Sequence, residues 1–281
     1  MVLAHNVDKL GQLPTALFRV AGKMKIPLAV FLVLLLNTGP SRAAVDAPTL
    51  QLLHLKGPIY LVEDSHYVAT NSLVYVGPSS VTVIGATWTP ETAQILANRI
   101  RTLTSLPIRE VIDTSPDPEW SGGNAYWKRI GAKIVAIKVT YDFLQRHWAE
   151  AVAAFQRNNP SYPNVPLVLP TVSYTGDFQL QQGRILAFYL GPSHTPADIF
   201  VYFPKEKLLD AGSILKEKLG NMANADVEAY PNTLRKLKAL NLPIDTIISG
   251  HWSAVHGPEL IDHYLELLKL NAQGQRKADP E

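Results

Sequence analysis

Residues 111–127, VIDTSPDPEWSGGNAYW, lead from an apolar strand through two prolines to a turn of small residues and a helix. Each proline fixes its own φ and pushes the preceding residue toward extended geometry. Residues two apart in an extended segment point the same way. Ser115, Asp117 and Glu119 are therefore expected on one face of a stiff loop at the end of a strand. Two acids held there could be solvated loop decoration, or they could hold a cation.

The chain around this loop divides into two halves, about residues 50–158 and 165–275, joined by a proline-rich link. Each half runs strands, then helix, strand and helix. Two facing mixed sheets with helices outside would bury both apolar faces, so we expect an α/β fold of αββα layers. Strands are expected at residues 58–62, 66–76, 80–88, 108–113, 133–139, 171–190, 198–203 and 244–250. Helices are expected at residues 90–103, 123–131, 140–157, 225–240 and 258–270.

The N-terminal segment has the pattern of a secretory signal peptide. An unbroken apolar run, IPLAVFLVLLL at residues 26–36, follows two lysines and precedes small residues that offer a cleavage site. The run is shorter than the roughly 20 residues that a membrane helix needs. Residues 1–44 are therefore interpreted as a signal peptide, with an uncleaved anchor as the alternative. Because Met24 stands where such a signal would begin, residues 1–23 are interpreted as an over-long start.

The charge balance and the lack of cysteine limit the classes of partner and ligand that the chain can bind. Residues 1–43 carry five basic side chains and one acidic side chain, so the remainder has 21 basic and 23 acidic residues. This balance argues against a nucleic-acid or anionic membrane surface. The chain has no cysteine, so an exported protein must rely on its core, and no thiolate can bind a metal. We expect one domain over residues 45–281, periplasmic or secreted, monomeric and free of the membrane after signal cleavage.

Three strand-end loops carry side chains that can bind a metal. They hold the acids Asp117 and Glu119 with Ser115, then His194 in GPSHTP, then His251 in IISGHW. Loops at the ends of strands are where sites usually form. Each signal alone is weak, because a lone loop histidine is more often a hydrogen-bonded surface group. The remaining histidines keep that interpretation: His54, His66, His147, His256 and His263.

Taken together, these loops and several longer motifs resemble the metallo-β-lactamase superfamily, specifically the mono-zinc subclass of class B β-lactamases that hydrolyses carbapenems. The resemblance covers roughly residues 56–265. It includes GPIYLVEDSHYV, VIGATWTPETA, GGNAYWKRIGAK, YPNVPLVLP, GPSHTPADIFVYFP, ILKEKLGN and HGPELIDHY. It implies the αββα metallo-β-lactamase sandwich, with the long helix of Trp148 overhanging the active site.

The expected metal ligands are altered. The subclass has an Asn-x-His-x-Asp pattern where this chain has Ser115, Asp117 and Glu119, and the position of its cysteine ligand is Ser213. Ser115 therefore stands at a family position without a clear role. A serine hydroxyl stays protonated near neutral pH and is a weak donor. Trp120, where the subclass has arginine, adds bulk beside the loop.

Counting charges suggests how the change is compensated. The subclass triad carries two negative charges, and Asp117 with Glu119 also supplies two. Our hypothesis is one divalent metal held by Asp117, Glu119, His194 and His251, with Ser213 as a further candidate. Zinc follows from the resemblance, and the harder ligand set also suits manganese or iron. The carboxylate that does not fully coordinate would be the general base.

Substrate-side features of the family are present. Lys216 matches the lysine that grips the substrate carboxylate, Asn221 the asparagine near the lactam carbonyl, and Trp88 a residue of the GATWTP motif. The sequence therefore predicts a metal-dependent hydrolase that opens β-lactams, carbapenems first, with a metal-activated water. Two alternatives stay open. One is an impaired member that binds β-lactams or cell-wall fragments without turnover, and the other is a hydrolase with a switched substrate.

Overall fold

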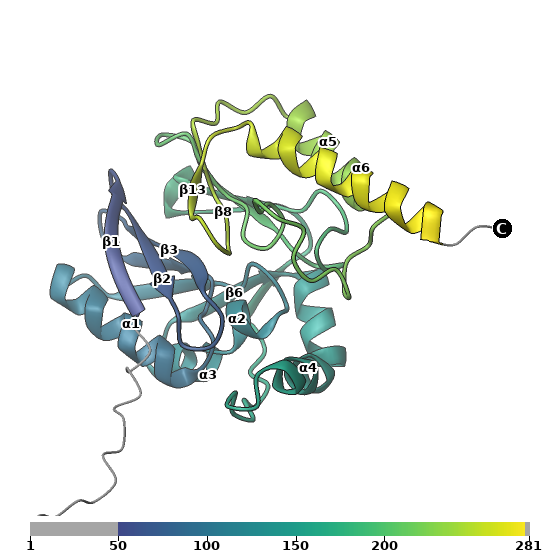
Figure 1. Cartoon of the computed structure of the whole chain (residues 1–281). Coiled ribbons are helices and arrows are strands. Elements are labelled where there is room, and N and C mark those ends of the chain that lie inside the picture. The colour runs from purple at the N-terminus through teal and green to yellow at the C-terminus, as the bar shows by residue number, and fades with distance from the viewer. Residues whose placement is uncertain (1–49, 279–281) are drawn as a thin grey trace, which may run out of the picture. The chain divides into compact units, whose positions relative to one another are not determined.

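The computed structural model of the protein describes residues 50–278, in which two sheets face each other (Figure 1). The predicted signal peptide lies outside the described residues. The first sheet has the order β1-β2-β3-β4-β5-β6-β7, antiparallel as far as β4 and parallel from there on. Its strands are β1 (Leu50–Lys56), β2 (Ile59–Asp64), β3 (Thr70–Val76), β4 (Val81–Ile84), β5 (Ile108–Ile112), β6 (Lys133–Ile137) and β7 (Val172–Tyr174).

The second sheet has the order β13-β12-β11-β10-β9-β8, and only β11 and β12 run parallel. Its strands are β8 (Phe178–Leu180), β9 (Ile185–Phe188), β10 (Phe200–Phe203), β11 (Leu208–Asp210), β12 (Thr246–Ile248) and β13 (Val255–His256). The stretch at residues 171–190, which the sequence analysis placed in the second half, is divided between the sheets, because β7 pairs with β6.

Helices cover the outer faces of both sheets, which gives the expected αββα layers (Figure 1). They are α1 (Pro90–Leu103), α2 (Pro118–Ser121), α3 (Asn124–Arg129), α4 (Lys138–Asn158), α5 (Tyr230–Ala239) and α6 (Leu260–Ala278), with a 3₁₀ turn η1 (Gln181–Gly183). α1 begins at a capping box of Thr89 and Thr92, with Pro90 in its first turn. No helix within residues 50–278 is both long and apolar enough to cross a membrane.

Three apolar clusters fill the interfaces between the layers. The one between the sheets joins buried residues of both, such as Leu73 on β3 and Leu208 on β11. The outer face of the first sheet packs on α1 and α3, and that of the second packs on α5 and α6. This arrangement leaves the loops that follow β5, β9, β11 and β12 together at one edge of the sandwich, where the site forms.

Candidate metal and substrate site

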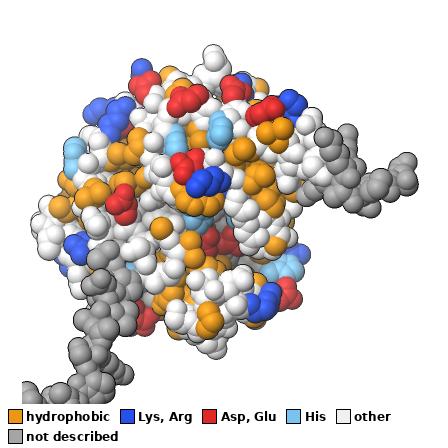
Figure 2. Space-filling model, in the orientation of Figure 1, with side chains coloured by type: hydrophobic (Ala, Val, Ile, Leu, Met, Phe, Trp, Pro, Cys, Tyr) orange, Lys and Arg blue, Asp and Glu red, His pale blue; other side chains and the backbone are white. Residues whose placement is uncertain are grey.

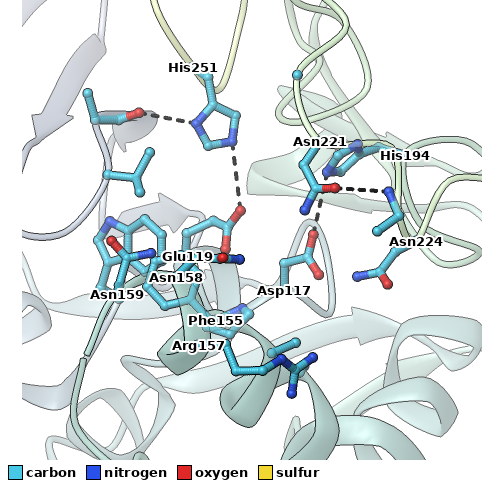
Figure 3. A pocket seen from close by; sticks show the side chains of 18 of the residues that line it. Asp117, Glu119, Phe155, Arg157, Asn158, Asn159, His194, Asn221, Asn224 and His251 are labelled. Atoms are coloured by element: carbon cyan, nitrogen blue, oxygen red, sulfur yellow. Dashed lines mark hydrogen bonds and ion pairs between the residues drawn. The ribbon is translucent and has the colours of Figure 1, made fainter. Parts of the chain in front are cut away.

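A pocket of about 510 Å³ lies where these loops meet. Figure 2 shows a hollow in this face with acidic side chains inside it. Figure 3 shows the four expected metal ligands around one cavity, and all four line it: Asp117, Glu119, His194 and His251. Trp88, Lys216 and Asn221, predicted to contact substrate, also line the pocket. Seven of the nine residues singled out from the sequence therefore meet in one cavity.

The two acids reach the pocket by a different local structure from the one expected. Asp117 has extended backbone and precedes α2, but Glu119 lies inside this four-residue helix. The alternating extended geometry predicted for Ser115, Asp117 and Glu119 is therefore wrong beyond Pro118. The turn that follows needs glycine, because a Cβ at Gly122 would lie 1.9 Å from the carbonyl oxygen of Trp88. This close approach fixes α2 against the end of the first sheet.

Each acid faces one histidine. His194 Nε2 lies 3.8 Å from Asp117 Oδ2, and His251 Nε2 lies 3.7 Å from Glu119 Oε1. Both separations exceed a good hydrogen bond. All four side chains are largely buried. The site is thus built as two carboxylate–imidazole pairs, one from each acid of the loop.

Contacts on the other ring nitrogen define the state of His251. Its Nδ1 lies 3.1 Å from the carbonyl oxygen of Ala69, which can only accept, so Nδ1 carries the proton. In the neutral ring Nε2 then presents a lone pair toward Glu119 and toward Ser213 Oγ, 3.5 Å away. Two lone-pair atoms that face each other across 3.7 Å are stabilised by a proton or a cation between them.

In His194 the protonated and unprotonated ring nitrogens are the reverse of those in His251. Lys216 Nζ lies 3.1 Å from His194 Nδ1. A charged ammonium only donates, so Nδ1 accepts and the neutral ring carries its proton on Nε2, directed at Asp117. A cation bound by Nε2 would replace this proton, as metal binding to histidine generally does. The two histidines of the pocket are therefore not equivalent.

Burial governs the charges in the pocket. It raises the pKa of Asp117 well above its usual range, and the nearby carboxylates of Glu119 and Asp198 raise it further. Burial lowers the pKa of His194 well below its usual range, with Lys216 and His251 adding to the effect. Burial also lowers the pKa of Lys216 to about 8, against the three carboxylates around it. An apolar-walled site of this kind favours neutralising its acids with a proton or a cation.

The two serines singled out from the sequence do not line the pocket. Ser213 Oγ accepts a hydrogen bond from Trp120 Nε1 at 3.0 Å and lies 3.5 Å from His251 Nε2. Ser115 Oγ accepts from the backbone N–H of Asp117 at 3.3 Å, and Ser115 also hydrogen bonds the buried carboxylate of Asp198. Both serines thus support the side chains that face the cavity.

Trp88 forms part of the pocket wall from within a cluster of aromatic rings. It is 1% exposed, and its Nε1 donates to Thr70 Oγ1 at 3.2 Å. Its ring contacts those of Tyr67, Phe155 and Tyr162. Little of the indole is therefore free to contact a ligand, and the contribution of Trp88 is to anchor the wall.

The donors present suit a divalent cation chemically. Imidazole and carboxylate together bind zinc, manganese and iron. Within residues 50–278, however, no three or more His, Cys, Asp or Glu side chains lie close enough to hold a metal ion. The geometry gives two separate pairs, and the pair of Glu119 and His251 has the free lone pairs that a cation needs. The four-ligand set expected from the sequence stays a prediction.

Several pocket residues were missed by the sequence analysis. The end of α4 contributes Arg157 and Asn158, and the residue after it contributes Asn159. Two loops contribute Asn224 and Trp252. Trp252 has a left-handed backbone with a φ of 57° and is 41% exposed. Polar residues at the end of a helix carry no sequence pattern that separates a pocket rim from a solvated surface.

Comparison with known proteins shows the family to which the chain belongs. The model of the metallo-beta-lactamase superfamily matches residues 67–251, a range that begins before β3 and ends at His251. The chain belongs to this superfamily. The expected family and the expected sandwich fold are both confirmed.

Individual members of the superfamily are similar to the chain over most of its length. Metallo-beta-lactamase IND-1 of Chryseobacterium indologenes is 26% identical over 230 residues, which cover 80% of this chain and 88% of the relative. A type 2 enzyme of Elizabethkingia meningoseptica is 24% identical over 268 residues, covering 92% and 99%. The solved structure of TMB-1 matches with a TM-score of 0.69 at 19% identity, covering 80% and 99%, which supports the fold. Homologues in this superfamily are hydrolases.

Proposed function

We propose that the protein is a metal-dependent hydrolase of the β-lactamase type, with carbapenems as its first expected substrates. The observation that supports the proposal is the meeting of two buried carboxylate–imidazole pairs in one pocket of a metallo-β-lactamase superfamily chain. Glu119 and His251 offer free lone pairs to a cation, whereas His194 carries a proton directed at Asp117. Hydrolysis needs both a site for positive charge and a group that moves protons.

In this proposal the position of each residue in the pocket gives its chemical role. Glu119 and His251 would hold one divalent cation, zinc by resemblance or else manganese or iron, with Asp117 and His194 as the further ligands expected from the sequence. The cation supplies Lewis acidity, which polarises a carbonyl and makes water a better nucleophile. Asp117 accepts a proton from water as the oxygen attacks the lactam carbonyl carbon. The same proton then reaches the lactam nitrogen when the C–N bond breaks.

Substrate contacts follow from the lining. Asn221 is exposed at the pocket, with its Oδ1 accepting from the backbone N–H of Ala223 at 3.0 Å, so its amide N–H₂ is directed to the ligand side in the proposed complex. Lys216 lies deeper, against His194. We also propose that the protein acts outside the cytoplasm, as a monomer, on a small-molecule substrate, in agreement with the signal-peptide interpretation of its N-terminus.

Metal content of the purified mature protein is the deciding measurement. We expect about one equivalent of a divalent metal by elemental analysis, and loss of most of it in Asp117→Ala and in His251→Ala. The matched control is His256→Ala, because His256 contacts the carbonyl oxygen of Ser253 outside the pocket. Full metal content in both pocket variants would exclude the proposed ligands.

Activity then separates the alternatives. Carbapenem hydrolysis that stops with a chelator and returns with metal supports the proposal. Bound metal without lactam turnover would indicate a hydrolase with a switched substrate. An empty site after incubation with zinc, manganese or iron would indicate a member that binds lactams or cell-wall fragments without turnover. The feature that favours this last alternative is Ser213 at the position of the family's cysteine ligand, because its hydroxyl oxygen already accepts a hydrogen bond from Trp120.

A further inference from the structure

The pocket has two cationic side chains in its lining, and they are placed very differently. Lys216 is 1% exposed, whereas Arg157 is exposed in the last turn of α4. No hydrogen bond or ion pair joins the Arg157 guanidinium to another residue in the described part of the chain. In Figure 3 Arg157 extends from α4, and in this view the two acids lie between it and His251.

Lys216 is already engaged in the site. Its Nζ contacts His194 Nδ1 at 3.1 Å, and the carboxylates of Asp198, Asp117 and Glu119 surround its charge. An anion that approached this ammonium through the pocket would meet the two acids that line it, Asp117 and Glu119, and would have to displace His194. The family role expected for Lys216, gripping the substrate carboxylate, is poorly served by this arrangement.

We propose that Arg157 receives the carboxylate of the substrate at the mouth of the pocket. This inference rests on the proposed function, because bicyclic β-lactams carry a carboxylate on the carbon next to the lactam nitrogen. A guanidinium forms two parallel hydrogen bonds to a carboxylate, which fixes orientation as well as adding affinity. Arg157 is thus a specificity-determining residue that selects anionic lactams and orients the ring toward the acids.

The asparagines beside Arg157 fit the same role. Asn158 and Asn159 follow it at the end of α4, and Asn224 lines the pocket from the loop after β11. Amide side chains are neutral, so they can hydrogen bond a carboxylate or the polar groups around it without adding negative charge. The acids of the pocket are Asp117 and Glu119, so the α4 rim is the part of the lining that an anion can approach most favourably.

The test compares a carbapenem with its carboxyl methyl ester. Dissociation constants are measured on the protein as purified, from the rapid change in tryptophan fluorescence before turnover. We expect the wild type to bind the free acid about tenfold more tightly than the ester, the size of a charge-assisted hydrogen bond. Arg157→Ala should lose this difference and leave ester binding unchanged, and Arg157→Lys should keep part of it. High salt should reduce the difference.

Arg146→Ala is the matched control, because Arg146 is on α4 and its Nε donates to the carbonyl oxygen of Asp142. It should behave as the wild type does. The inference is overturned if Arg157→Ala retains the full preference for the acid, or if only Lys216→Met removes it. A wild type that binds acid and ester equally also overturns it, while leaving the proposed function intact. A wild type that neither binds nor hydrolyses either compound contradicts the proposed function itself.

Discussion

At the scale of single residues, the buried pair of Asp113 and Asn124 joins the two ends of the loop that carries Asp117 and Glu119. Asn124 Nδ2 donates to Asp113 Oδ2 at 2.7 Å. Asp113 Oδ1 and Asn124 Oδ1 are both buried without a partner among the described residues. The hydroxyl of Ser121 is near the acid but donates to the carbonyl oxygen of Ser115. A protonated Asp113 would donate from Oδ1 to Asn124 and complete two hydrogen bonds.

This pairing predicts opposite effects for two substitutions. Asp113→Asn should fold well, because an amide can both accept from and donate to Asn124, whereas Asp113→Ala should lower the free energy of unfolding by about 1–3 kcal/mol. Burial raises the pKa of Asp113 well above its usual range. Its stabilising effect is therefore full below the unfolded pKa near 4 and is lost as pH rises through the folded pKa. Urea unfolding from pH 5 to 9 measures both effects.

The expected sign of the pH effect makes the test specific. Wild-type stability should fall relative to Asp113→Asn as pH rises, because the asparagine cannot ionise. A constant gap between the two proteins across this range would mean that Asp113 is charged in the folded protein.

Individual site residues were predictable to different degrees. The strand-end loops and the family pattern indicated Asp117, Glu119, His194 and His251 as candidate ligands. These four side chains do line one pocket, and their role as ligands stays a prediction. The difference between the two histidines depends on Lys216 and on the carbonyl of Ala69, each of which contacts Nδ1 of one ring and is distant from it in sequence. Sequence patterns carry no information on which nitrogen of a histidine is protonated, since that depends on a contact made only in the folded chain.

At the scale of elements, α4 is held over the pocket by rings. Phe155 of α4, Trp88 after β4, Tyr162 of the proline-rich link and Tyr67 before β3 pack with centroids 4.6–5.9 Å apart. Tyr162 also donates its hydroxyl to the carbonyl oxygen of Trp88 at 2.7 Å. The loop that precedes β3 continues to Ala69, the hydrogen-bond acceptor of His251. The cluster therefore connects the overhanging helix to a residue of the site.

Substitutions in this cluster should cost stability in proportion to what they remove. Phe155→Ala should lower the free energy of unfolding by about 3 kcal/mol, and Tyr162→Phe, which loses one hydrogen bond, by about 1 kcal/mol. Chemical denaturation measures both. Phe143→Ala, on the same helix with its ring against His147, is the comparison outside the cluster. A larger loss for Phe143→Ala than for Phe155→Ala would show that α4 is held mainly by its first turns.

Helices and strands were predicted well where one hydrophobic periodicity, helical or alternating, dominated the sequence. A helix was expected at residues 140–157, and α4 there buries Leu144, Trp148 and Val152 at helical spacing. The stretch at residues 171–190 was harder, because a strand pattern gives no information on which sheet a strand joins. β7 pairs with β6 across a long link, so that choice is made by tertiary packing.

At the scale of the whole molecule, the two sheets share one core. The cluster between them draws on both sheets, with Tyr75 of β3 stacked on Phe203 of β10 at 5.8 Å. The sequence indicated two similar halves, each with its own strands and helices. Neither half can bury the inner face of its sheet alone, so the halves are layers of one cooperative unit rather than separate domains.

The shared core predicts that damage to either sheet destabilises both. Leu73 on β3 and Leu208 on β11 are fully buried in it, so Leu73→Ala and Leu208→Ala should each lower the free energy of unfolding by about 2–5 kcal/mol. Hydrogen exchange of β2–β4 and of β9–β11, followed by mass spectrometry in increasing urea, should show both sheets losing protection in one transition. Leu53→Ala, at a 42% exposed position on β1, should change stability by less than about 0.5 kcal/mol. If Leu208→Ala opened only the second sheet while the first kept its protection, the halves would be independent folding units. The pocket, which takes loops from both halves, would then form only when the two folded halves dock.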